Sequence, residues 1–135
     1  MEDEGQPRLS ITILAVADTV RSALFYREAF GWKVRVEVPV YVELELPDGA
    51  GLGLYQREAF GRNTGQAPHP HPAGALSGAE LYFRTVELEP AQRRLEAAGA
   101  RLLSPLAPRD WGDEVVYYSD PDGHVVALAR VLDGD

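Results

Sequence analysis

The chain has 135 residues, a length that predicts a single domain built around one hydrophobic core. Hydrophobic residues make up 45% and charged residues 25% of it, which is typical of globular proteins and excludes disordered and collagen-like classes. The lack of cysteine excludes disulfides, thiolate nucleophiles and cysteine-bound metals, and the formal net charge of -8 argues against nucleic acid as a partner.

The sequence also bears on where the protein resides. No apolar run approaches the roughly 20 residues needed to span a membrane, so we expect no membrane partner. The first five residues, Met1 to Gly5, are acidic and lack the basic and apolar regions of a secretory signal. We therefore expect a cytoplasmic protein.

The first half of the sequence predicts four strands and one helix. Residues 10–16 are β-branched and apolar and predict a strand, after which Asp18 is placed to cap a helix that Gly31 ends. Three further strands are predicted by alternating or apolar patterns, at residues 33–38, 41–46 and 51–56. We assign residues 9–60 to this first βαβββ module.

The second half predicts the same order of elements. A segment rich in glycine and proline, residues 61–78, shows no periodicity and predicts a linker loop. A strand at 81–86 and a helix from Glu89 to Ala98 follow it. Three more strands are predicted, at residues 101–106, 114–119 and 125–131. Residues 79–131 therefore form a second βαβββ module.

Short motifs support the repeat. The turn Pro47-Asp48-Gly49 of the first half stands at the same structural place as Pro121-Asp122-Gly123 of the second. With the helix that opens at Asp18-Thr19-Val20 and the turn that ends at His124, the chain resembles the vicinal oxygen chelate superfamily. That superfamily includes glyoxalase I, extradiol dioxygenases and bleomycin-resistance proteins. The resemblance implies an α+β fold in which tandem modules form a cupped eight-stranded mixed sheet with the helices on its outer face.

The resemblance also implies four metal-ligand positions, two in each module. In the metal-dependent members, His, Gln or Glu side chains at these positions hold a divalent ion in the cup. Carried onto this sequence, the positions fall on Ile11, Gly53, Glu80 and Ala127. Three of these side chains have no donor atom, so we expect no metal cofactor at the usual place. We also expect Gly53 and Ala127 to leave space at the centre of the cup.

The open face of the predicted sheets is expected to bind a small organic ligand. Aromatic planes with a few fixed charges suit a flat or cationic molecule, as in the bleomycin-resistance members of the superfamily. The expected ligand-binding residues are Tyr41, Glu43, Tyr55, Glu80, Tyr82, Arg84, Trp111 and Tyr117. The tyrosines have an alternative explanation, because tyrosine is a good strand former.

Glu80 is the candidate catalytic residue. Its carboxylate could act as a general base or pair with a cationic ligand, or it could simply face solvent and pair with Arg84. Trp111 is either a lid over the ligand or a structural plug, and Trp32 is expected in the core or in a dimer contact.

The three histidines are not expected to bind metal. His69 and His71 lie in the proline-rich loop without a third preorganised donor. His124 follows a turn glycine and is expected to be exposed at the turn.

Two hypotheses of function follow. The favoured one is a metal-free binding protein for a small aromatic or cationic molecule. The alternative is a lyase, isomerase or dioxygenase of the same superfamily, with a metal on non-standard ligands such as Glu80, Glu43 and a tyrosine, or with Glu80 acting alone as base. A homodimer, which the resemblance implies, is compatible with both.

Overall fold

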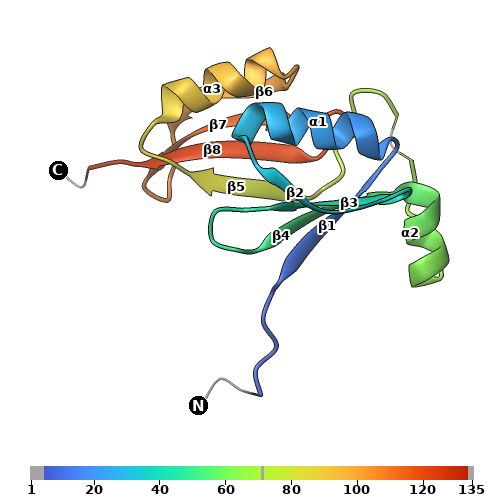
Figure 1. The fold of residues 1–135 in the computed structure, drawn as a ribbon. Helices are drawn as coiled ribbons and strands as arrows, with labels where there is room; N and C mark the ends of the chain where they lie inside the picture. The colour runs from blue at the N-terminus through green and yellow to red at the C-terminus, as the bar shows by residue number, and fades with distance from the viewer. Residues whose placement is uncertain (1–4, 71, 134–135) are drawn as a thin grey trace.

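The computed structural model describes residues 5–70 and 72–133 of the chain, and within them eight strands and three helices are formed (Figure 1). The first half contains β1 (Ile11–Val16), α1 (Thr19–Phe30), β2 (Lys33–Val38), β3 (Tyr41–Glu45), β4 (Gly51–Gln56) and α2 (Arg57–Thr64). The second half contains β5 (Glu80–Arg84), α3 (Leu88–Ala97), β6 (Arg101–Pro108), β7 (Asp113–Ser119) and β8 (Val125–Val131). The predicted strands and the two predicted helices are all present.

The strands form two mixed sheets with identical topology. The strand order is β1-β4-β3-β2 in the first sheet and β5-β8-β7-β6 in the second. In each sheet the first strand of the module pairs parallel with the last, and the other pairs are antiparallel. The α+β fold and the repeat are therefore confirmed, with the eight strands divided into two sheets of four.

Local chemistry explains how α1 begins and ends. The Asp18 carboxylate accepts hydrogen bonds from the backbone N–H groups of Val20 and Arg21 at 3.0 and 3.2 Å, which satisfies donors that have no partner within the helix. At the other end Gly31 adopts a left-handed conformation with φ 75°, which costs glycine little because it lacks Cβ.

The core lies between the helices and one face of each sheet. Helices α1 and α3 lie side by side over the strands (Figure 1). Tyr26 of α1, Leu95 of α3 and Tyr118 of β7 are completely buried. Trp32 is buried and stacks on Phe30 at 4.3 Å between ring centroids, in agreement with a core role. The two modules therefore share one hydrophobic core, and α1 and α3 leave the opposite face of each sheet uncovered, although Phe60 of α2 packs against Tyr55 on that face of the first sheet.

The segment after β4 differs from the expectation. Residues 57–64, which include the expected start of the linker, form helix α2. The Gln56 side chain accepts from the backbone N–H of Ala59 at 3.0 Å and so caps the helix. Gly61 is a poor helix former, yet a Cβ atom there would lie 2.6 Å from the Cα atom of Ala67, so close packing requires glycine.

No helix within residues 5–70 and 72–133 has both the length and the apolar character needed to cross a membrane.

Candidate functional site

The structure divides the eight expected ligand-binding residues between the two sheets. Tyr41, Glu43 and Tyr55 lie on the open face of the first sheet. The other five belong to the second sheet or its loops, with Trp111 in the loop between β6 and β7. Except for Glu80, they form two clusters, which we describe in turn.

The first-sheet cluster is centred on Glu43, whose residue surface is only 7% exposed. The Arg35 Nε atom donates to one carboxylate oxygen at 2.8 Å, and the Tyr41 hydroxyl donates to the other at 2.5 Å. The hydrogen bond from Tyr41, helped by Arg35, lowers the pKa of the Glu43 carboxyl, while burial and the carboxylate raise the pKa of the Tyr41 hydroxyl. Tyr55 packs edge-on against Tyr41.

The space expected at Gly53 is filled. A Cβ atom built on Gly53 would lie 2.5 Å from the Tyr41 hydroxyl oxygen, so the tyrosine ring lies directly over this glycine. The expectation of an open centre above Gly53 was wrong, because the hydrogen bond to Glu43 draws Tyr41 across the sheet. A longer side chain at position 53 would displace Tyr41.

The second-sheet cluster is centred on Asp113, which is 2% exposed. Its Oδ2 atom accepts a hydrogen bond from the Tyr82 hydroxyl and another from Arg84 Nε at 3.1 Å. The indole N–H of Trp111 donates to the Tyr82 hydroxyl oxygen at 2.9 Å, and 58% of the Trp111 surface is exposed. Burial and the hydrogen bond to Asp113 raise the pKa of the Tyr82 hydroxyl.

Tyr117 and Ala127 lie deeper in the same face. They pack with Val115 and Ala129 in a small apolar cluster that is separate from the main core. The Arg109 guanidinium carbon lies 5.1 Å from the centroid of the Tyr117 ring. Ala127 is fully buried, so its small side chain leaves no open space above it.

Glu80 lies apart from both clusters. It is exposed and borders a cavity of about 280 Å³ between β1 and β5, which Ile11 and Tyr82 also line. Arg84, its expected alternative partner, is bound to Asp113 instead. Within the described residues the Glu80 carboxylate makes no hydrogen bond or ion pair. It is therefore available to a ligand in this cavity, which we call the inter-module groove.

The residues at the family's metal positions do not fit a divalent ion. Only Glu80 among them carries a donor atom, and Ile11 places an aliphatic side chain beside it. In residues 5–70 and 72–133, no three His, Cys, Asp or Glu side chains gather closely enough to hold a metal. Glu43, a candidate non-standard ligand, already accepts hydrogen bonds from an arginine and a tyrosine.

The histidines that the structure describes differ in their exposure to solvent. His69 is exposed in the loop, and His71 lies outside the described residues. His124 was expected to be exposed but is 7% exposed, so that expectation was wrong. Its Nε2 atom lies 3.0 Å from the carbonyl oxygen of Ala15, and its Nδ1 atom lies 2.8 Å from the Ser77 hydroxyl. The ring is buried because it packs between β1 and the loop before β5.

Sequence analysis missed Arg35 and Asp113, which complete the two clusters. Arg35 carries a weak signal, because it alternates with Lys33 and Glu37 on a strand predicted to pair with that of Glu43. Asp113 carries no signal in the sequence, because its role depends on a hydrogen bond from Tyr82, which is 31 residues away in sequence.

Two βαβββ modules with one shared core and open sheet faces define the class to which this chain belongs. Residues 8–128 match the family model of the Glyoxalase/Bleomycin resistance protein/Dioxygenase superfamily. The chain belongs to this superfamily.

Individual relatives are distant. The chain is 24% identical over 130 residues to the metallothiol transferase FosB of Bacillus licheniformis, a match that covers 95% of this chain and 78% of FosB. Among solved structures, a glyoxalase-related enzyme from Fulvimarina pelagi superposes with a TM-score of 0.80 at 27% identity, covering 91% of this chain and 87% of the other. A lactoylglutathione lyase from Agrobacterium tumefaciens superposes with a TM-score of 0.70 at 23% identity, covering 91% and 92%. The last similarity shows the fold alone.

Proposed function

We propose that this protein binds a small cationic aromatic molecule in the inter-module groove, without a metal at the family positions. The observation that carries this proposal is the Glu80 carboxylate, which has no partner among the described residues and lies beside the Tyr82 ring. The two buried carboxylates of the open faces are each paired with an arginine, whereas Glu80, together with Asp48 of the same lining, supplies negative charge for a cation.

Aromatic contacts support the same proposal. Trp111 is bound to the Tyr82 hydroxyl and keeps much of its surface exposed, so it adds a second aromatic surface close to the groove. A flat cation held between aromatic faces and a carboxylate gains both cation–π and Coulomb attraction. Glu80 is the cation-binding residue in this proposal, and Tyr82 and Trp111 are the aromatic contacts.

The alternative function is a metal-dependent lyase, isomerase or dioxygenase, to which the comparison with FosB adds a transferase. The similarity to a metallothiol transferase favours it. The lack of donor atoms at Ile11, Gly53 and Ala127 opposes it. Elemental analysis distinguishes the metal-free binding protein from the metal-dependent enzyme. The protein is incubated with manganese, nickel or zinc and then dialysed before its metal content is measured. Stoichiometric metal that survives dialysis would make the enzyme the working model.

We also propose that two chains pair in solution. Each open face carries only one cluster, and a second chain could place a first-sheet cluster opposite a second-sheet cluster. Size-exclusion chromatography with light scattering tests this proposal. A monomer at micromolar concentration would contradict it and leave the inter-module groove as a site within one chain.

Tryptophan fluorescence tests the binding proposal. N-methylquinolinium is a flat cationic aromatic probe, and we expect it to quench the fluorescence of the exposed Trp111 saturably but not that of the Trp111→Phe variant. Glu80→Gln should weaken binding at least about tenfold, since a charge-assisted contact is worth about 1.5–3 kcal/mol. Glu37→Gln is the matched control, because it removes an exposed carboxylate from β2 without touching the groove. Equal affinities for both variants would remove Glu80 from the site.

A further inference from the structure

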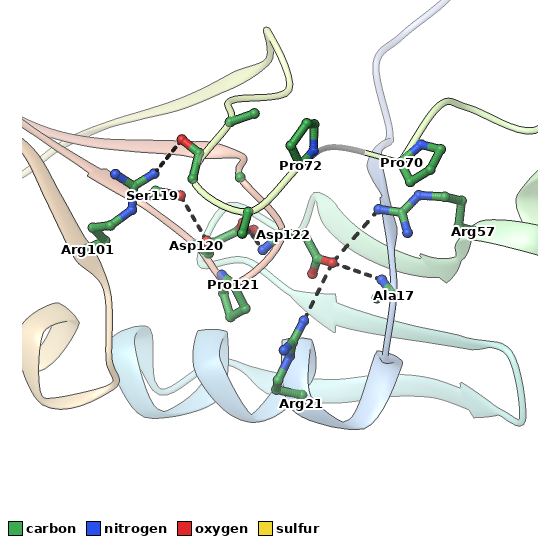
Figure 2. A pocket seen from close by; sticks show the side chains of 14 residues that line it. Ala17, Arg21, Arg57, Pro70, Pro72, Arg101, Ser119, Asp120, Pro121 and Asp122 are labelled. Carbon is green, nitrogen blue, oxygen red and sulfur yellow. Dashed lines mark hydrogen bonds and ion pairs between the residues drawn. The ribbon is translucent and has the colours of Figure 1, made fainter.

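A second cavity lies at the turn that joins β7 to β8, away from the groove. It has a volume of about 330 Å³ and is lined by residues of the turn, by the loop before β5 and by three arginines (Figure 2). Arg21 comes from α1, Arg57 is the first residue of α2, and Arg101 is the first residue of β6. Three arginines from separate elements therefore line one cavity in a chain whose net charge is -8, with Arg101 on the other side of the turn from Arg21 and Arg57 (Figure 2).

The guanidinium groups are only loosely engaged by the protein. Arg21 and Arg57 lie 3.7 and 4.0 Å from the Oδ1 atom of Asp122, whereas the hydrogen-bonded pair Arg35–Glu43 is separated by 2.8 Å. Neither side chain donates a hydrogen bond to any described residue, and Arg101 donates one, to the Gly74 carbonyl oxygen. Each guanidinium has five N–H donors, so most donors around the cavity are available to a ligand.

The two carboxylates of the turn, those of Asp120 and Asp122, accept hydrogen bonds from within the protein. Asp120 accepts from the Tyr26 hydroxyl at 2.6 Å and from the backbone N–H groups of Asp122 and His124. The Asp122 Oδ1 atom accepts from the backbone N–H of Ala17 at 2.9 Å, and the Asp122 side chain is 3% exposed. Its Oδ2 atom has no partner among the described residues, yet neither arginine is drawn onto it. Asp120 and Asp122 both line the cavity and offset two of the three positive charges, so an excess of one positive charge remains.

We infer that this cavity is a binding site for the phosphate group of a small phosphorylated molecule, recognised by Arg57, Arg101 and Arg21. Guanidinium groups match the oxygen atoms of phosphate in geometry as well as in charge. The remaining positive charge favours an anion, and a phosphate monoester is anionic near neutral pH. The volume exceeds that of a phosphate group, so an organic part fits beside it.

Nuclear magnetic resonance locates and measures this binding with inorganic phosphate as the probe, at fixed pH and ionic strength. We expect saturable shifts of the backbone amide signals of Ala17, Asp122 and Gly123, with sulfate acting similarly and acetate more weakly. Arg57→Gln and Arg101→Gln should each raise the dissociation constant at least about tenfold, as expected for the loss of a charge-assisted contact.

Arg62→Gln is the matched control, because Arg62 lies on the same helix as Arg57 but does not line the cavity. Its affinity should stay within about twofold of the parent, a change worth less than 0.5 kcal/mol by the usual conversion. Because Arg57 and Arg101 lie on different elements, local unfolding does not explain weakening in both, and dispersed spectra confirm folding. Absence of saturation, shifts elsewhere, or equal weakening by Arg62→Gln would overturn the inference.

Discussion

On the first sheet the buried carboxylate belongs to Glu43, in the middle of β3, whereas on the second sheet it belongs to Asp113, the first residue of β7. Each accepts hydrogen bonds from a tyrosine hydroxyl and from the Nε atom of an arginine. The strand register pairs Glu43 with Gly53 and Tyr117 with Ala127, so the position equivalent to Glu43 in the second module holds Tyr117.

This comparison separates what the repeat preserves from what it does not. Strand order is the same in both modules, and the register of β1–β4 and β3–β4 matches that of β5–β8 and β7–β8, because hydrophobic alternation and turn geometry set them. The edge strands differ, since β6–β7 has two register shifts and β2–β3 has one. The polar clusters have the same chemistry at different positions, because any buried carboxylate requires hydrogen-bonding and charged partners. A residue's role in one module therefore does not transfer to its equivalent in the other.

The largest expected effect compares the two equivalent turn glycines. Gly49 and Gly123 both have positive φ, 92° and 87°, but only at Gly123 would a Cβ atom meet another group, the Ala75 carbonyl oxygen at 2.4 Å. Gly123→Ala should lower the free energy of unfolding by about 3 kcal/mol and Gly49→Ala by about 1 kcal/mol, since strain and overpacking add. Urea denaturation measures both. Equal losses of unfolding free energy would show that the loop at Ala75 moves aside without destabilising the fold.

A smaller effect distinguishes the two arginines. The Arg35 side chain is 32% exposed and that of Arg84 is 60% exposed, so solvent screens the second ion pair more strongly. We expect Arg35→Met to cost about 2 kcal/mol of stability and Arg84→Met less than about 1 kcal/mol. The opposite order in urea denaturation would mean that Asp113 depends on Arg84 more than its exposure implies.

The smallest effect concerns acid. The folded-state pKa of Glu43 lies below its ordinary value of 4.5, so its carboxylate stabilises the fold above that pH, and this contribution is lost as pH falls through the folded pKa. Glu43→Gln should therefore flatten the dependence of stability on pH between about 4.5 and the acid limit of folding. Glu37→Gln, which removes a carboxylate from exposed β2, serves as the control.

The sequence predicted most of the fold because its signals are local. Period-two patterns identified the strands, even β2, which is exposed along its whole length, and Asp18 and Gly31 marked the ends of α1. Helix α2 was missed because Gly61 and Asn63 are poor helix formers and because the close approach of Gly61 to Ala67 is a tertiary contact.

The candidate site was predicted less completely because it depends on distant contacts. Alternation placed Tyr41 and Glu43 on the open face of β3, and Tyr82 on that of β5, but it carries no information about how the two sheets lie relative to each other. The buried position of His124 depends on the carbonyl group of Ala15, 109 residues earlier. Such contacts follow from tertiary packing, so they cannot be predicted from the spacing of residues in the sequence.

The shared core has a consequence for how the chain folds and for how it can be divided. Helices α1 and α3 pack on each other, and the turn before β8 holds the end of β1 through hydrogen bonds to Ala15 and Ala17. Either module alone would expose the apolar surface that the other covers. The βαβββ unit is thus a unit of topology but not of autonomous folding. Chain breaks between residues 65 and 70 should give two fragments that fold only on association.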